Sequence, residues 1–203
     1  MELREAADCI RTAVRAIMPA VSSAGATLLV SEEEYLDSSY HPDREFVDGQ
    51  LLERNVGERK HSILQGELII YFGKRRKKWR VQAFPAQRVR LADRHYRIPD
   101  VSVYKEPAPR EDVFATPPFI AIEILSRKDR MSRIREKIDD YLKFGVLYVW
   151  VIDPYRRKAD VYIQGHFYEA GDLILRAEDP RIEVPLAELF QACLLYTSPS
   201  PRD

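Results

Sequence analysis

Hydrophobic residues recur along the middle of the chain at two different spacings. Apolar positions three or four residues apart predict helices over residues 61–74 and 132–144, and Gly145 supplies a stop for the second helix. Alternating or continuous apolar runs predict strands, which span residues 81–91, 97–104, 118–125 and 146–152. The predicted order of the core is therefore one helix, three strands, one helix and one strand.

Turn signals add shorter elements on both sides of this core. Ser31 is followed by three glutamates, and this capping box predicts a short helix. The Asp48-Gly49 dipeptide lies between apolar stretches and predicts a hairpin over residues 45–54. Residues 158–163 and 165–168 predict a closing hairpin. The pattern thus favours one α/β domain with a β-hairpin added near each end.

The two ends of the chain differ from this domain, which we place at residues 27–192. Residues 1–26 carry apolar positions at helical spacing among charged residues, which predicts an N-terminal helix, docked or loosely held, rather than a signal peptide. An over-extended start site is the alternative. Residues 193–203 resemble the translation of a transposon-type sequencing adaptor, and a natural tail rich in Pro and Ser is the alternative. Under either interpretation, we expect residues 193–203 to carry no function.

Composition narrows the class of protein without identifying a partner. The chain has 203 residues, 45% of them hydrophobic, which is enough for one folded domain. Lys plus Arg and Asp plus Glu both total 32, so net charge does not indicate a polyanionic partner. The two cysteines have neither metal-ligand nor disulfide spacing and suit a cytoplasmic location. No apolar run reaches the roughly 20 residues of a membrane span, so no membrane association is expected.

A single charge, Glu123, interrupts the apolar run of residues 118–125. Burial of an ionised carboxylate costs several kcal/mol unless the group is paired or bound to a metal. Asp100 lies on the preceding predicted strand, and adjacent strands can bring two carboxylates to within about 5 Å of each other. Such a pair suits Mg²⁺, which activates water for phosphodiester hydrolysis. The alternative is a buried salt bridge at Glu123, with Asp100 as a turn residue.

An ordered series of short motifs surrounds these two carboxylates. It comprises Glu45-Phe46-Val47-Asp48-Gly49, His61, Arg97-Ile98-Pro99-Asp100, Glu123-Ile124-Leu125-Ser126, Glu136-Lys137, Tyr141, Phe144-Gly145-Val146 and Trp150-Val151-Ile152-Asp153-Pro154. In this series, residues 27–190 resemble the Uma-type restriction endonuclease family, part of the PD-(D/E)xK nuclease superfamily. The resemblance implies a restriction-endonuclease-like core with a central mixed sheet and a metal-dependent, DNA-cleaving ancestry.

The resemblance places Asp100 and Glu123 at the carboxylate positions of the nuclease signature, as catalytic residues and metal ligands. The lysine that usually follows the glutamate by two residues is absent, because Leu125 stands there. Lys137 on the next predicted helix is the substitute, since a helix packed beside the strand can direct an ammonium group toward the attacking water or the phosphate. The alternative is that Lys137 is an ordinary surface residue of that helix.

Glu45 and His61 are two further candidates for the catalytic site. Glu45 would be a third metal ligand, and His61 would orient water or contact a phosphate. The alternatives are a surface charge on the hairpin for Glu45 and a helix-capping role for His61. Ser126 can hydrogen-bond at the end of its strand, and Arg127 stands where the family commonly has a proline, which adds positive charge beside the site.

Two groups of basic residues are candidates for nucleic-acid binding. One is a dense run at the end of the first predicted helix, made of Lys74, Arg75, Arg76, Lys77 and Lys78, and Trp79 beside it could stack on a base. The other follows the predicted strand at 118–125 and consists of Arg127 and Lys128. The alternative for the first group is a solvated helix end that is favourable to the helix dipole, with Trp79 as a core residue.

The expected function is hydrolysis of DNA phosphodiester bonds by an endonuclease that depends on Mg²⁺ or Mn²⁺. The alternative is a catalytically inactive nucleic-acid-binding or protein-interaction module that has kept the nuclease fold. DNA is the expected substrate, and the hairpins at both ends offer strands that could pair in a homodimer.

Overall fold

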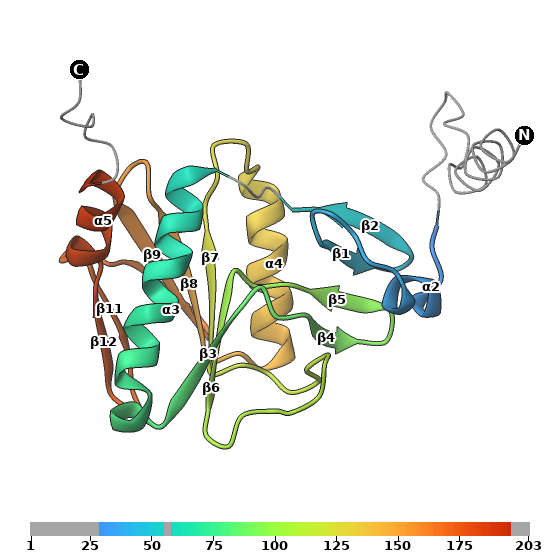
Figure 1. The fold of residues 1–203 in the computed structure, drawn as a ribbon, viewed down its shortest axis with the longest axis horizontal. Helices are drawn as coiled ribbons and strands as arrows, with labels where there is room; N and C mark the ends of the chain where they lie inside the picture. The colour runs from blue at the N-terminus through green and yellow to red at the C-terminus, as the bar shows by residue number, and fades with distance from the viewer. Residues whose placement is uncertain (1–28, 55–57, 196–203) are drawn as a thin grey trace, which may run out of the picture.

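A six-stranded mixed sheet forms the centre of the protein in the computed structural model, which describes residues 29–54 and 58–195 (Figure 1). Its strand order is β10-β9-β8-β7-β6-β3. The strands are β3 (Val81–Pro85), β6 (Val101–Lys105), β7 (Ile120–Ile124), β8 (Tyr148–Asp153), β9 (Lys158–Ile163) and β10 (His166–Glu169). Only β7 and β8 pair in parallel, and the other neighbours are antiparallel. The expected mixed α/β fold is confirmed.

The two long helices cover opposite faces of this sheet, as the alternation of side chains along β7 shows. Ile120, Ile122 and Ile124 pack in the cluster that includes residues of α3 (Arg59–Trp79). Ala121 packs instead in the cluster that includes residues of α4 (Met131–Phe144). Because side chains alternate between faces along a strand, Glu123 lies on the α4 face with Ala121.

The connection from β7 through α4 to β8 is the crossover that joins the two parallel strands. The apolar residues Ile134, Ile138 and Tyr141 form the buried stripe of α4. Gly145 ends the helix with φ +104°, a left-handed conformation that favours glycine over residues with a Cβ atom.

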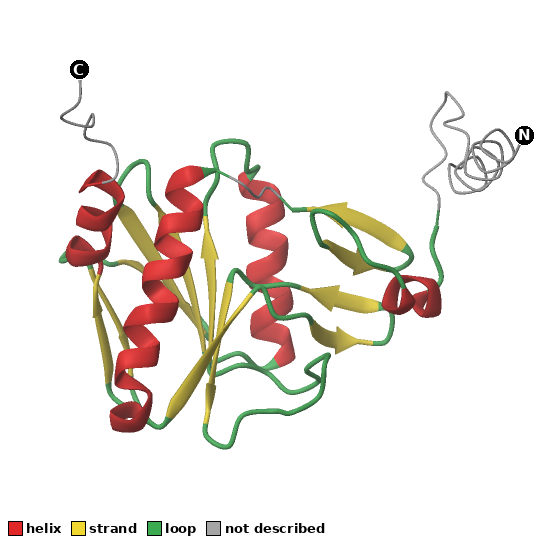
Figure 2. Ribbon diagram, viewed as in Figure 1, coloured by secondary structure: helices red, strands yellow, loops and turns green. Residues whose placement is uncertain are grey.

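A smaller sheet of order β2-β1-β5-β4 lies beyond α4 in the view of Figure 2. Its strands are β1 (Arg44–Val47), β2 (Gln50–Glu53), β4 (Val89–Ala92) and β5 (His95–Arg97). The short helix α2 (Glu32–Asp37) packs on this sheet through Tyr35, which stacks on Phe46. Leu91 of β4 packs in the α4 cluster, which fixes the small sheet against the core. The small sheet therefore forms the second wall of the region beside Glu123.

A third element pair, absent from the expectations, closes the α3 face. The strands β11 (Ile174–Ala177) and β12 (Ile182–Pro185) form a hairpin, and α5 (Leu186–Leu195) follows it. Buried residues of this segment, among them Leu175, Val184 and Leu189, join the cluster around α3. Part of the core thus comes from a segment that the hydrophobic pattern left unassigned.

Some predictions for individual elements are confirmed and others were wrong. The cap of α2 is confirmed, because Ser31 Oγ accepts a hydrogen bond from Glu34 N, and the hairpin around Asp48-Gly49 is β1–β2. The prediction of one strand over 81–91 was wrong: β3 and β4 belong to different sheets, and between them Ala86 adopts φ +47°. The strand predicted over 97–104 is likewise the end of β5 followed by β6.

The terminal predictions fall mostly outside the described residues. The N-terminal helix predicted over residues 1–26 lies there, as do residues 196–203 of the predicted adaptor tail. Residues 193–195 of that tail form the end of α5. No described helix is long and apolar enough to cross a bilayer.

Candidate active site

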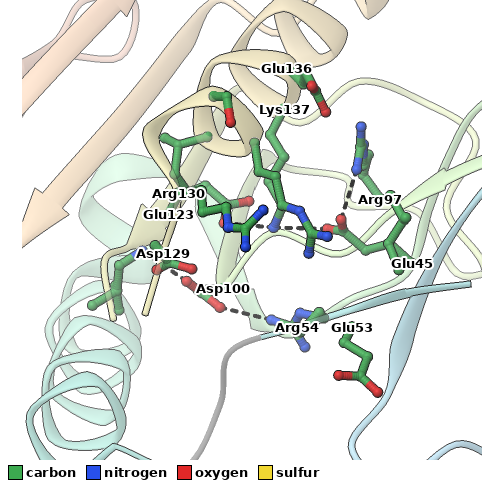
Figure 3. Close-up of a pocket in the computed structure, with 15 residues that line it drawn as sticks. Glu45, Glu53, Arg54, Arg97, Asp100, Glu123, Asp129, Arg130, Glu136 and Lys137 are labelled. Atoms are coloured by element: carbon green, nitrogen blue, oxygen red, sulfur yellow. Dashed lines mark hydrogen bonds and ion pairs between the residues drawn. The ribbon is translucent and has the colours of Figure 1, made fainter. Parts of the chain in front are cut away.

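The predicted catalytic carboxylates line a cavity of about 300 Å³ between the central sheet, α4 and the small sheet (Figure 3). Asp100, Glu123 and Glu45 come from three separate segments of the chain, and all three side chains are buried. Arginines and a lysine line the same cavity, namely Arg54, Arg97, Arg130, Arg133 and Lys137. The cavity is therefore densely charged with both signs.

The register of the central sheet brings Asp100 beside Glu123. Val101 of β6 is paired with Ile122 of β7. Because the strands are antiparallel, the same register continued by one residue places Asp100 opposite Glu123. Residues opposite each other in an antiparallel pair have Cα atoms roughly 5 Å apart. Asp100 Oδ2 also accepts a hydrogen bond of 2.8 Å from Ile124 N, which fixes the carboxylate against β7.

Residues from two other segments hold Asp100 in place. Arg54, which follows β2, donates to Asp100 Oδ1 at 2.7 Å. His61 and Gln65 lie one turn apart on α3: His61 Nε2 is 3.1 Å from Asp100 Oδ2, and Gln65 Nε2 donates to the backbone carbonyl of Asp100 at 2.7 Å. His61 is therefore a partner of the Asp100 carboxylate rather than a helix cap, and Arg54 and Gln65 are residues of the candidate site that the sequence did not reveal.

The charges around Asp100 shift the pKa values of this group and its partner. Burial alone would raise the pKa of Asp100, but the hydrogen bond and charge of His61, with Arg54, hold it below its ordinary value. Burial alone would lower the pKa of His61, but the hydrogen bond to Asp100 outweighs it and raises that pKa. The pair is stabilised with the histidine protonated and the carboxylate ionised.

Glu123 receives both of its partners from α4. Lys137 Nζ donates to Glu123 Oε2 at 3.0 Å, and the Tyr141 hydroxyl donates to Oε1 at 2.6 Å. Burial is the main cause that raises the pKa of Glu123 to about 7; Lys137 opposes this rise, and the neighbouring charge of Asp100 adds to it. Lys137 and Tyr141 are spaced four residues apart, so they project from the same face of the helix.

Lys137 bridges two carboxylates, because its Nζ also lies 2.9 Å from Glu45 Oε1. The ammonium is largely buried, with 14% of its side chain exposed, and burial alone would lower its pKa. The charges of Glu123 and Glu45 raise the pKa instead, so the group is a permanent cation. Leu125, where the nuclease signature has lysine, packs against the α4 cluster. A cation therefore reaches the site from the helix in place of the strand.

Glu45 is held by a second arginine that ties the small sheet to α4. Arg97 Nη1 donates to Glu45 Oε2 at 2.9 Å, and Ile98 N donates to Oε1 at 3.2 Å. The other side of the guanidinium donates to Asp140 Oδ2 of α4 through Nε at 2.8 Å and Nη2 at 2.7 Å. His95 Nε2 lies 3.0 Å from the same oxygen. The contacts Asp140–Arg97–Glu45–Lys137–Glu123 form one continuous chain (Figure 3 shows the part from Arg97 to Glu123).

Residues 33–189 match the sequence profile of the Uma2 family, whose description is "Putative restriction endonuclease". That span includes every residue of the charged cluster, by which we mean the carboxylates that line the cavity and the side chains that contact them. The chain belongs to the Uma2 family. Membership supports a nuclease, that is, a hydrolase that acts on nucleic acids.

One solved structure supports the mixed α/β fold of this Uma2-family chain, while no curated protein matches the chain. A crystal structure of "a putative nuclease belonging to DUF820" from Anabaena variabilis ATCC 29413 has a TM-score of 0.67 and 23% identity, and the match covers 83% of this chain and 99% of that one. A "DrdV-DNA complex" solved by electron cryomicroscopy matches with a TM-score of 0.39 and 14% identity over 71% of this chain and 12% of that one, too distant a likeness to support a comparison.

The donor set of the Uma2-family site fits Mg²⁺ or Mn²⁺ with two carboxylates rather than three. Asp100 and Glu123 are neighbours on the sheet and line the cavity together, and Mg²⁺ is commonly held by one or two carboxylates with water and substrate phosphate completing its shell. Among the described residues, no three acidic, histidine or cysteine side chains are grouped to hold an ion. Glu45, predicted as the third ligand, instead has Lys137 between itself and Glu123.

The structure separates the two predicted groups of basic residues. Arg127 and Lys128 are exposed in the loop between β7 and α4, at the end of the sheet where Glu123 lies. The Lys74–Lys78 run lies in the last turns of α3, whereas His61 is in its first turn, so roughly 20 Å of helix separates the run from Asp100. Trp79 is buried with Phe72 in the core, as the alternative had it.

Proposed function

We propose that this protein is an endonuclease that hydrolyses phosphodiester bonds of DNA with Mg²⁺ or Mn²⁺ held by Asp100 and Glu123. The observation that carries the proposal is the place of Lys137, whose ammonium lies on Glu123 although the lysine of the nuclease signature is absent from the strand. Family membership and the cavity beside both carboxylates support it.

Each residue of the cluster has a separate task in this proposal. A bound divalent ion would lower the pKa of an attacking water and neutralise charge that develops on the phosphate. Asp100 and Glu123 would hold that ion, and Lys137 would donate hydrogen bonds to the attacking water or to a phosphate oxygen as negative charge grows there. Because Glu45 and Glu123 already hold the ammonium of Lys137 before the reaction, this cation needs little reorganisation to stabilise the developing charge.

The remaining charged residues keep these groups in position. Glu45 fixes the ammonium of Lys137, and Arg97 fixes Glu45 with the help of Asp140. His61 and Arg54 orient the two oxygens of Asp100. An ion bound at Asp100 Oδ1 would compete with Arg54 for this oxygen, so the contact between Arg54 and Asp100 must loosen when the ion binds there.

A plasmid-nicking assay tests the proposal. The parent protein with Mg²⁺ or Mn²⁺ should convert supercoiled plasmid to open-circular and linear forms, and E123Q should lose this activity because the amide cannot supply a charged ligand. E136Q is the matched control, because Glu136 also lines the cavity from α4 but makes no side-chain hydrogen bond or ion pair with the cluster among the residues that the structure describes. Absence of nicking by the parent with either ion would overturn the proposal.

A second candidate function rests on the way in which the carboxylates are satisfied. Both oxygens of Asp100, Glu123 and Glu45 already accept a hydrogen bond or an ion pair from a neighbouring group. A fully paired network stabilises a fold without any ion. This favours a nucleic-acid-binding module with the nuclease fold but no catalysis, and that protein would bind DNA in the nicking buffer without cleaving it.

A further inference from the structure

The cations that line the cavity fall into two classes. Arg54, Arg97 and Lys137 are each paired with a carboxylate of the cluster. Arg130 and Arg133 also line the cavity, but neither makes an ion pair with a carboxylate in the part of the chain that the structure describes. Both are exposed. Two guanidinium groups therefore stand at the rim of the cavity with their hydrogen-bonding capacity open to a ligand.

The position of these two arginines works against the stability of α4. Arg130 is the N-cap residue and makes no side-chain capping bond, Arg133 is in the first turn, and that turn contains no acidic residue. Cations at a helix N-terminus are unfavourable, because the helix dipole places partial positive charge there. A choice of residues that opposes local stability is common where a site requires the charge.

Acidic neighbours at the same rim leave the arginines available. Asp129 lines the cavity, and its Oδ2 accepts a hydrogen bond of 2.6 Å from Ser126 N, so it stabilises its own loop. Glu53 lines the cavity from the small sheet, and its Oε1 is paired with Arg44. Figure 3 shows Arg130 on the Glu123 side of the cavity, while Glu53 points away from Asp100. Glu136 is a further acidic residue of the lining, and Arg130 and Arg133 are the exposed cations of the rim on the α4 side.

We propose that Arg130 and Arg133 bind a backbone phosphate of the nucleic acid beside the bond that is cut, so that the strand crosses the cavity over the first turn of α4. The proposal rests on the proposed function for the identity of the ligand. Guanidinium groups suit this ligand, because their fixed fork of donors matches two phosphate oxygens. The basic run at the far end of α3 takes no part in this contact, since it lies roughly 20 Å of helix away from the site.

Binding of a short fluorescein-labelled DNA duplex, followed by anisotropy without divalent ions over a series of salt concentrations, tests the proposal. We compare the parent with R130A/R133A and with the control K74A/K77A. The control removes the same charge at the same spacing from exposed helical positions. The arginine variant should bind roughly tenfold or more weakly, and the slope of log affinity against log salt should become shallower by about 0.9, since the two arginines share one phosphate and each neutralised phosphate contributes about 0.9. The control should bind within about twofold of the parent.

Three outcomes would overturn the inference: unchanged binding in R130A/R133A, equal losses in both variants, or no binding by the parent. R130K/R133K adds a second readout, because it keeps the charge and removes the fork: it should restore the salt slope but not the full affinity. The midpoint temperature of thermal unfolding of R130A/R133A should be equal to or higher than that of the parent. This result would show that weaker binding comes from the lost contact and not from a loss of folded protein. Because the assay contains no divalent ion, a parent that binds DNA through these arginines but cannot nick plasmid contradicts only the proposed function.

Discussion

The ammonium group of Lys137 lies 3.0 Å from Glu123 Oε2, although the two residues belong to a helix and a strand 14 positions apart. A lysine two residues after the glutamate would approach from the strand itself, and Leu125 prevents that here. Lys137 delivers the cation to the same carboxylate from α4, where Glu45 supports it from the opposite side at 2.9 Å. A buried cation thus contacts the Glu123 carboxylate from the helix and not from the strand.

Replacement of Lys137 by methionine should separate chemistry from folding. If the ammonium stabilises the reacting phosphate, the rate of plasmid nicking should fall by about a hundredfold or more. Removal of the cation also leaves the buried carboxylate of Glu123 without a counter-ion, so the free energy of unfolding should fall by roughly 3–5 kcal/mol. Lys143→Met, an exposed position on the same helix, is the control and should change neither quantity. A K137M protein that nicks plasmid at the parental rate would rule out this role for the lysine.

The hydrophobic pattern predicted the central strands and the buried charge of Glu123, but it did not predict the residues that contact the carboxylates of the site. Glu123 stood out because a single carboxylate in a continuous apolar run is costly, and it is indeed buried on β7. The parallel pair β7–β8 and the helix between them follow from apolar runs and helical spacing that are both strong. The element types there are fixed largely by local sequence.

Other parts of the site depend on contacts that local sequence does not reveal. Arg54 and Gln65 reach Asp100 from segments that are 46 and 35 positions away, and nothing in their own neighbourhoods marks them. The division of residues 81–91 between two sheets turns on Ala86, whose positive φ is unusual for a residue other than glycine, asparagine or aspartate. The contacts of Arg97 with Glu45 and Asp140 could not be predicted. In the sequence, Arg97 and Asp140 look like surface charges, and they meet only because β5 packs beside α4.

Asp140 gives a prediction with a defined dependence on pH. Burial alone would raise the pKa of Asp140, but its bonds to His95 and Arg97 hold that pKa below the ordinary value. Its contribution to stability is therefore complete above the unfolded pKa of about 3.9 and is lost as the pH falls through the lower folded pKa. In urea titrations, the difference in unfolding free energy between the parent and D140N should be constant from about pH 7 to pH 5 and should shrink below about pH 4. A difference that grows with acidity would contradict the assigned contact.

Two glycines on the main helices should respond to alanine with opposite signs. Gly145 ends α4 with φ +104°, so Gly145→Ala should destabilise the protein by roughly 1–2 kcal/mol. Gly73 lies inside α3, and a Cβ atom there would meet nothing within 4 Å, so Gly73→Ala should stabilise the protein by about 0.5–1 kcal/mol. Chemical denaturation of both variants measures the effect, and a stabilised G145A would contradict the helix end described here.

Calorimetric titration of Mg²⁺ or Mn²⁺ into the parent and into Asp100→Asn tests most directly whether Asp100 and Glu123 form a metal site. The substitution keeps the size of the side chain and a carbonyl oxygen but removes the negative charge on which a hard cation depends. We expect one metal site per chain in the parent and no measurable binding in the variant. Absence of binding in the parent, or equal binding in both proteins, would contradict it.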